Sequence, residues 1–181
     1  IGTFGIYNNP IILVEVARKF IDHDIHFILG GDGVFFKEVE ENSVGLPNLT
    51  LTGWLSKDEI SYVLSLSNIG IAPCYNPTAA FPNKVFVYLS AGLPIISSIE
   101  GDLREIIEKY QIGFYYPPND VDVLGNCIMK LYNDQMLYKK MSENAKRVFD
   151  EMFDADKIYG EYAEHIEKIA NESRKNVKTF D

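Results

Sequence analysis

The sequence FPNKVFVYLSAGLPIISS, residues 81–98, decides the fold because it combines a helix start, an apolar helix and a following strand. Lys84 is the only charged residue between Glu59 and Glu100. Pro82 suits the first position of a helix, which puts Lys84 in the first turn. Free backbone N–H groups and the helix dipole favour an anion there. A lysine in such a stretch either extends from a core into solvent or binds an anion, and its place at a helix start favours a phosphate-bearing ligand.

Short apolar runs alternate with helical patterns on both sides of this stretch. The runs expected to be strands are Ile1–Tyr7, Ile25–Gly30, Leu49–Leu55, Ile69–Cys74, Pro94–Ile99 and Gly113–Tyr116. They are continuously apolar, as expected for a parallel sheet that is covered on both faces. Six strand–helix alternations predict an α/β fold, with a Rossmann-like, doubly wound, parallel six-stranded sheet.

Helical patterns alone follow Pro118. Expected helices cover Val121–Asn133, Gln135–Met152 and Asp154–Ser173, and an earlier helix opens with a candidate capping box at Ser56–Glu59. The sequence therefore predicts a Rossmann-like domain over residues 1–152 and a C-terminal helical extension and tail over residues 153–181.

Composition excludes several classes of protein. A net charge of −9 and a pI of about 4.8 argue against a nucleic-acid partner, which would need a basic surface. Cys74 and Cys127 lack metal-site spacing, so we expect two buried free thiols in a reducing compartment and no metal site. The sequence shows no signal peptide, and Ile1 already belongs to an expected strand. We therefore expect the chain to be part of a longer, cytoplasmic protein.

Ligands of open parallel sheets bind at the carboxyl ends of the strands, near the point where strand order reverses. Gly30-Gly31-Asp32-Gly33 follows the second expected strand, either as an anion-binding loop or as a simple turn. Trp54 follows the third and either stacks on a base or packs beside the sheet, and packing is favoured. GxGxxG, GxSxG, Walker A and HExxH motifs are absent. No residue is assigned a catalytic role.

The ordered segments resemble the C-terminal, nucleotide-sugar-binding domain of GT-B glycosyltransferases of the group 1 (family 4) type. The resemblance runs from Ile1 to about Met152. It rests on ILGGDG at 28–33, LTGWL at 51–55, SNIGIAP at 67–73, FPNK at 81–84, AGLPII at 91–96 and IGFYYPP at 112–118. Each segment is weak evidence by itself, whereas six in this order are specific.

The resemblance implies one half of a GT-B fold that binds a nucleoside diphosphate sugar. The sugar would pass, with retained configuration, to a glycan or lipid-linked acceptor held by a separate N-terminal domain. No cofactor or metal is obligatory, the base is open, and that other half would provide any peripheral membrane association. The implied donor-site residues are Gly2, Thr3, Gly31, Gly33, Trp54, Leu55, Phe81, Pro82, Asn83, Lys84 and Val87.

The chain departs from the family at charged positions of the donor site. Two acidic residues of the family correspond to Ala79 and Val87, an arginine corresponds to Thr3, and a lysine corresponds to Asn8 or Asn9. Each lost charge-assisted bond forfeits about 1.5–3 kcal/mol. Two or three such losses lower affinity by about two to five orders of magnitude. A catalytically degenerate GT-B-like subunit with a binding or scaffolding role is therefore the alternative. A sugar-nucleotide epimerase ranks lower, because the strand ends lack acidic and histidine pairs.

Overall fold

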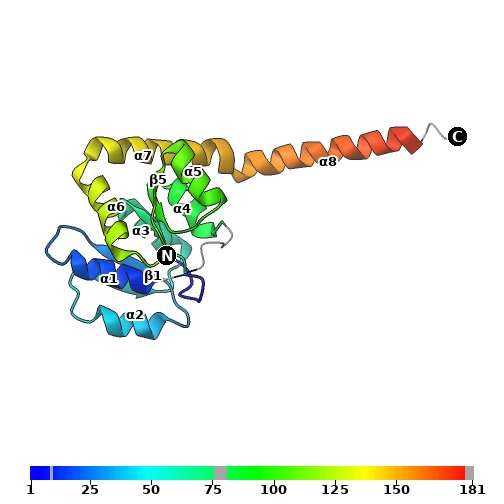
Figure 1. Ribbon diagram of the computed structural model, residues 1–181. Helices are drawn as coiled ribbons and strands as arrows, with labels where there is room; N and C mark the ends of the chain where they lie inside the picture. The colour runs from blue at the N-terminus through cyan, green and yellow to red at the C-terminus, as the bar shows by residue number, and fades with distance from the viewer. Residues whose placement is uncertain (9, 76–80, 178–181) are drawn as a thin grey trace.

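The computed structural model describes residues 1–8, 10–75 and 81–177, and side chains as far as residue 171. Strands occupy the centre, helices surround them, and the last helix projects from the rest (Figure 1). The elements are α1 Ile11–Lys19, β1 Phe27–Gly30, α2 Phe36–Ser43, β2 Leu49–Gly53, α3 Lys57–Leu66, β3 Gly70–Ala72, α4 Asn83–Ser90, β4 Ile95–Ser97, α5 Asp102–Tyr110, β5 Gly113–Tyr115, α6 Val121–Asn133, α7 Gln135–Val148, η1 Phe149–Phe153 (a π-helix) and α8 Ala155–Val177.

The strands are parallel and form two hydrogen-bonded groups. One group pairs β1 with β2, and the other runs β3–β4–β5. The chain moves outward from β1 to β2 and, separately, outward from β3 to β5. Strand order therefore reverses between β1 and β3, where a parallel sheet binds its ligands.

The expected strand at Ile1–Tyr7 is not confirmed, because the described residues contain five strands and not six. Gly2 N–H donates to Gly30 O and Phe4 N–H donates to Asp32 O, both at 2.8 Å. The chain then turns, and Asn8 N–H donates to Gly5 O at 3.0 Å. Residues 1–4 are thus extended beside the end of β1, but the run is too short to form a strand ladder.

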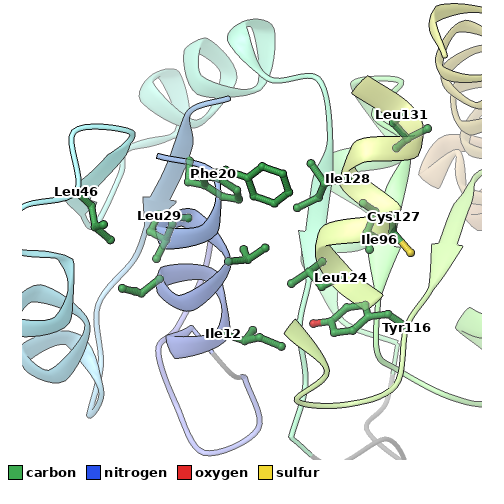
Figure 2. Packing of buried hydrophobic residues seen from close by; sticks show 14 of the residues in the cluster. Ile12, Phe20, Leu29, Leu46, Ile96, Tyr116, Leu124, Cys127, Ile128 and Leu131 are labelled. Carbon is green, nitrogen blue, oxygen red and sulfur yellow. The ribbon is translucent and has the colours of Figure 1, made fainter. Parts of the chain in front are cut away.

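Hydrophobic packing on both faces of the strands confirms the doubly wound architecture. Ile96 of β4 belongs to a buried cluster shared with α1 and α6, whereas its neighbour Ile95 belongs to a second cluster with α4, α5 and α7. Successive strand residues point to opposite faces, so β4 is covered on both. Figure 2 shows the first cluster, in which Phe20, directly after α1, faces α6 residues such as Ile128.

The C-terminal helices follow the predicted order. The bounds of α6 are the expected ones, whereas the second expected helix divides into α7 and the π-helix η1. The Asp154 carboxylate accepts a bond from Lys157 N–H at 3.0 Å, and α8 then leaves the other elements (Figure 1). Every side chain described on α8 is exposed, including Ile158, Tyr162 and Ile166.

Candidate functional site

A cavity of about 570 Å³ lies between β1 and β3, where strand order reverses. Its lining includes Gly2, Thr3, Asn8 and Lys84, which gather beside the carboxyl end of β1. The structure thus brings the opening glycine segment and the lysine of residues 81–98 to one place, although 76 positions separate Asn8 from Lys84 in the sequence.

Lys84 is the second residue of α4. The helix begins at Asn83, and Pro82 precedes it in an extended conformation, so Pro82 lies one position earlier than expected. Burial lowers the pKa of the Lys84 ammonium to about 8. In the described part of the chain, no carboxylate forms an ion pair with Lys84. Among the residues that the structure describes, Lys84 is therefore a partly buried cation without a counter-ion.

The side chain of Asn8 holds the Lys84 ammonium. Lys84 Nζ donates to Asn8 Oδ1 at 3.0 Å, and Asn8 Nδ2 donates to Thr3 O at 2.7 Å. The ammonium also lies close to Gly2. A Cβ added at Gly2 would be 3.7 Å from Lys84 Nζ. Sequence reasoning placed Asn8 only as a substitute for a lysine and missed this positioning contact, which pairs residues distant in sequence.

Gly31 and Gly33 chiefly allow the Gly30–Gly33 loop to lie close to the backbone of residues 1–4. A Cβ at Gly31 would come within 1.8 Å of Gly2 O, and one at Gly33 within 2.6 Å of Phe4 O. Both glycines also have a φ that favours glycine, 152° and 146°. The loop therefore serves as a turn against residues 1–4.

Several N–H groups expected to bind an anion already have protein acceptors. Gly2 donates to Gly30 O, Gly31 to Gly53 O at 2.7 Å, and Gly33 to its neighbour's carboxylate at 2.6 Å. The first turn of α4 is different, because a helix provides no acceptor for its first N–H groups. Within residues 1–8, 10–75 and 81–177, the N–H groups of Asn83 and Lys84 have no backbone acceptor, which makes them candidate donors to an anion.

Trp54 and Leu55 follow β2. Trp54 is 65% exposed, so the favoured interpretation of a packed tryptophan is wrong. Leu55 lies against the backbone at Gly30, since its Cδ1 would be 2.7 Å from a Cβ there. An exposed aromatic ring beside the Gly30–Gly33 loop is a suitable surface for a nucleotide base.

Phe81 and Val87 are held by packing. The Phe81 ring stacks on Phe86 at 4.9 Å and contacts Phe153 at 5.6 Å, which joins the start of α4 to the π-helix. Val87 is half-buried on α4 and offers only hydrocarbon. Ala79 and Asn9 lie outside the described residues.

Two buried serines fix the strand ends beside the site. Ser98 Oγ accepts from Cys74 N–H at 2.8 Å and donates to Cys74 O at 3.1 Å, while Ser97 Oγ donates to Ala72 O at 2.9 Å. Cys74 and Cys127 are buried, as predicted, and neither forms a disulfide. No described helix combines the length and apolar character needed to cross a membrane.

Comparisons with known proteins identify the family and the fold of the chain. The family model described as "Glycosyl transferases group 1" matches residues 1–148. The chain is 29% identical over 166 residues to the O-antigen chain mannosyltransferase C of Escherichia coli, covering 90% of this chain and 44% of that protein. It is also 29% identical over 134 residues to the sulfoquinovosyl transferase SQD2 of Arabidopsis thaliana, covering 72% of this chain and 25% of that protein. The chain thus spans less than half the length of these relatives.

Solved structures share the fold. The Anabaena protein Alr3699/HepE, crystallised with UDP-glucose, superimposes with a TM-score of 0.77 at 19% identity, covering 92% of this chain and 48% of that one. A glycosyltransferase from Rickettsia africae gives a TM-score of 0.78 at 20% identity, covering 93% of this chain and 47% of that one. These likenesses confirm the α/β architecture with parallel strands. Because the family model covers most of the sequence, the chain belongs to the group 1 glycosyl transferases.

Proposed function

We propose that this chain is the donor-binding half of a retaining glycosyltransferase. It binds a nucleoside diphosphate sugar, whose sugar passes to a glycan or lipid-linked acceptor held by an N-terminal domain. Family membership supports the class of reaction. The finer assignment rests on the site between β1 and β3.

The observation that carries the proposal is the position of Lys84. Its ammonium lies at the start of α4, half-buried, and its described hydrogen-bond partner is the neutral amide of Asn8. A diphosphate would provide the missing negative charge. The N–H groups of Asn83 and Lys84 and the positive end of the helix dipole add to the attraction.

The rest of the ligand follows from neighbouring residues. The exposed ring of Trp54 and the side chain of Leu55 would lie along the base. Uridine diphosphate is the first nucleotide to test, because Alr3699/HepE has been crystallised with UDP and with UDP-glucose.

Calorimetry with UDP tests the role of Lys84. Lys84→Met should weaken binding at least tenfold, because a charge-assisted bond is worth about 1.5–3 kcal/mol. Lys139→Met is the matched control, since Lys139 is exposed on α7 and forms only a surface ion pair with Glu143. Equal affinities of the native chain and Lys84→Met would contradict the proposal.

The second candidate is a degenerate subunit without donor binding, and the hydrocarbon side chain of Val87 favours it. A thermal-shift panel of UDP, GDP, ADP and their sugars separates the two functions. A ligand at 100 times its Kd adds about 2.7 kcal/mol to the free energy of unfolding. No shift with any ligand at millimolar concentration would favour the degenerate subunit.

Under the donor-binding proposal, Val87→Glu should strengthen binding of a nucleotide sugar, because its carboxylate can accept from a hydroxyl.

A further inference from the structure

Three phenylalanine rings join the start of α4 to the end of the π-helix η1. The ring centroids of Phe81 and Phe86 lie 4.9 Å apart, those of Phe86 and Phe153 5.1 Å apart, and those of Phe81 and Phe153 5.6 Å apart. Each ring therefore lies against both of the others, at separations where aromatic pairs attract each other. We refer to Phe81, Phe86 and Phe153 as the aromatic cluster. It is a tertiary contact, because Phe153 is distant in sequence from the other two.

The aromatic cluster lies on the side of α4 that is turned away from the donor site. Lys84 and Phe86 are two positions apart in the helix, so their side chains project about 200° apart around its axis. Lys84 reaches Asn8 and the cavity between β1 and β3, whereas Phe86 packs on Phe153 of η1. The start of α4 is thus held by η1 on one side and presents its ammonium on the other.

The beginning of α4 depends on this support, because it is not capped. Pro82, at the N-cap position, has no side-chain capping hydrogen bond, and such a bond is worth about 1 kcal/mol to a helix. Val85 and Leu89 anchor α4 in the second buried cluster, but both follow Lys84. The residue ahead of Pro82 is Phe81, whose ring packs on Phe86 and Phe153. The path of the chain into the first turn is therefore fixed by ring packing.

We propose that Phe153 is a positioning residue for the donor site: through Phe81 and Phe86 it sets the direction in which α4 begins, and so the place of the Lys84 ammonium. Phe153 is the last residue of η1, and a π-helix is a rare element that is frequently found at functional sites. The proposal rests on the proposed function for its ligand alone, because the surroundings of Lys84 can be measured in the ligand-free chain.

A matched set of variants separates positioning from stability. Phe153→Ala removes the ring, and Phe153→Tyr keeps it. Phe149→Ala is the control, because Phe149 lies in the same π-helix, is also half-buried and packs against the same buried cluster. Its described ring contact is with the Lys146 ammonium, 5.3 Å from the centroid, and not with the aromatic cluster. Both alanine variants should lower the urea midpoint, whereas only Phe153→Ala should change the donor site.

Titration of Lys84 in the ligand-free chain reports the surroundings of its ammonium. The NMR resonance of its ε-methylene group, identified by its loss in Lys84→Met, should give a native pKa of about 8. In Phe153→Ala this pKa should rise by at least about 0.5, because a less confined ammonium regains solvent. Phe153→Tyr and Phe149→Ala should keep the native value. An unchanged pKa in Phe153→Ala, or an equal rise in Phe149→Ala, would overturn the positioning role.

Calorimetry with UDP at pH 7 shows whether the place of Lys84 matters for the ligand. Phe153→Ala should bind at least about fivefold more weakly than Phe149→Ala, and Phe153→Tyr should bind like the native chain. Equal affinities of the two alanine variants, in chains that bind UDP, would overturn the positioning role and leave the proposed function intact. A native chain that does not bind UDP would contradict the proposed function, and the titration alone would then decide the role of Phe153. If Phe153→Ala does not fold, Phe153→Leu replaces it with the same expectations, because leucine keeps apolar volume but loses the ring.

Discussion

Lys84 shows how one residue joins fold and chemistry. The apolar surroundings that bury its stem also lower the pKa of its ammonium from the usual 10.5 to about 8. A group whose pKa is lowered in the folded state opposes folding while it is protonated, so this penalty is full below pH 8 and disappears as pH rises toward 10.5. A bound diphosphate would remove the penalty by pairing with the charge.

The lowered pKa predicts a pH dependence of nucleotide binding. Affinity for UDP should be constant from pH 7 to about 8 and then fall by up to tenfold per pH unit, because the free protein loses the Lys84 proton. Lys84→Arg should remove this fall, since a guanidinium stays protonated throughout the range. Calorimetry between pH 7 and 9.5 on both chains measures the effect. The same fall in both would exclude Lys84 as the titrating group.

Gly31 gives a prediction on stability. Gly31→Ala should cost at least about 3 kcal/mol, because the new Cβ meets Gly2 O and adds an overpacking cost to the strained φ. Gly45→Ala is the matched control. Its φ of 81° is also unfavourable for alanine, but a Cβ there has nothing within 4 Å. Urea unfolding of both variants separates the clash from the φ penalty, and equal losses would contradict the close approach of the two segments.

The site could be predicted only in part from single residues. Lys84 stands out because no other charge occurs from Ile60 to Ile99, and a helix start explains its role. The part played by Asn8 could not be found, because its contact with Lys84 depends on the path of residues 1–8 beside β1. The exposure of Trp54 likewise depends on which elements cover the end of β2, which local sequence does not specify.

The start of a helix can be predicted when it depends on contacts between residues that are close in sequence. The capping box at the start of α3 is confirmed, with Ser56 N–H donating to Glu59 at 2.7 Å and Ser56 Oγ accepting from Glu59 N–H at 3.4 Å. The π-helix η1 was not predicted, because it arises where Phe149 and Phe153 pack against the second core. The unconfirmed strand at Ile1–Tyr7 failed for a related reason. Residues 1–4 form only two backbone hydrogen bonds to residues 30–32 before the chain turns, which is too few for a strand ladder.

The capping box predicts the stability of α3. Ser56→Ala should lower the free energy of unfolding by about 1 kcal/mol, since the first-turn N–H of Glu59 loses its acceptor. Ser61→Ala, within the same helix, is the control and should change stability by less than about 0.5 kcal/mol. Its exposed hydroxyl only donates to Lys57 O. Thermal or urea unfolding measures both, and an equal effect of the two substitutions would contradict the capping role.

Considered as a whole, the molecule consists of a packed α/β body and a projecting helix. All described side chains of α8 are exposed, so removal of residues 155–181 should shift the melting temperature by less than about 2 °C. Phe153→Ala should have a larger effect, costing about 2 kcal/mol, because Phe153 packs on Phe81 and Phe86. Calorimetric melting compares the two variants. A large loss on truncation would show that α8 belongs to the folded body, contrary to the expected extension at residues 153–181.

The strands form two separate hydrogen-bonded groups. The α/β body should therefore resist deformation within each group better than sliding of one group past the other. In the described structure, side-chain packing between α1 and α6 joins the two groups on one face (Figure 2). Gly31 lies beside the β1–β2 group and Lys84 on α4 beside the β3–β4–β5 group, so a shear between the groups would change the distance between these two residues. The stiffness of this seam, rather than any residue in contact with ligand, would then set how sharply the protein discriminates ligands of different length. Core substitutions at Phe20 or Ile128 would soften it from a distance.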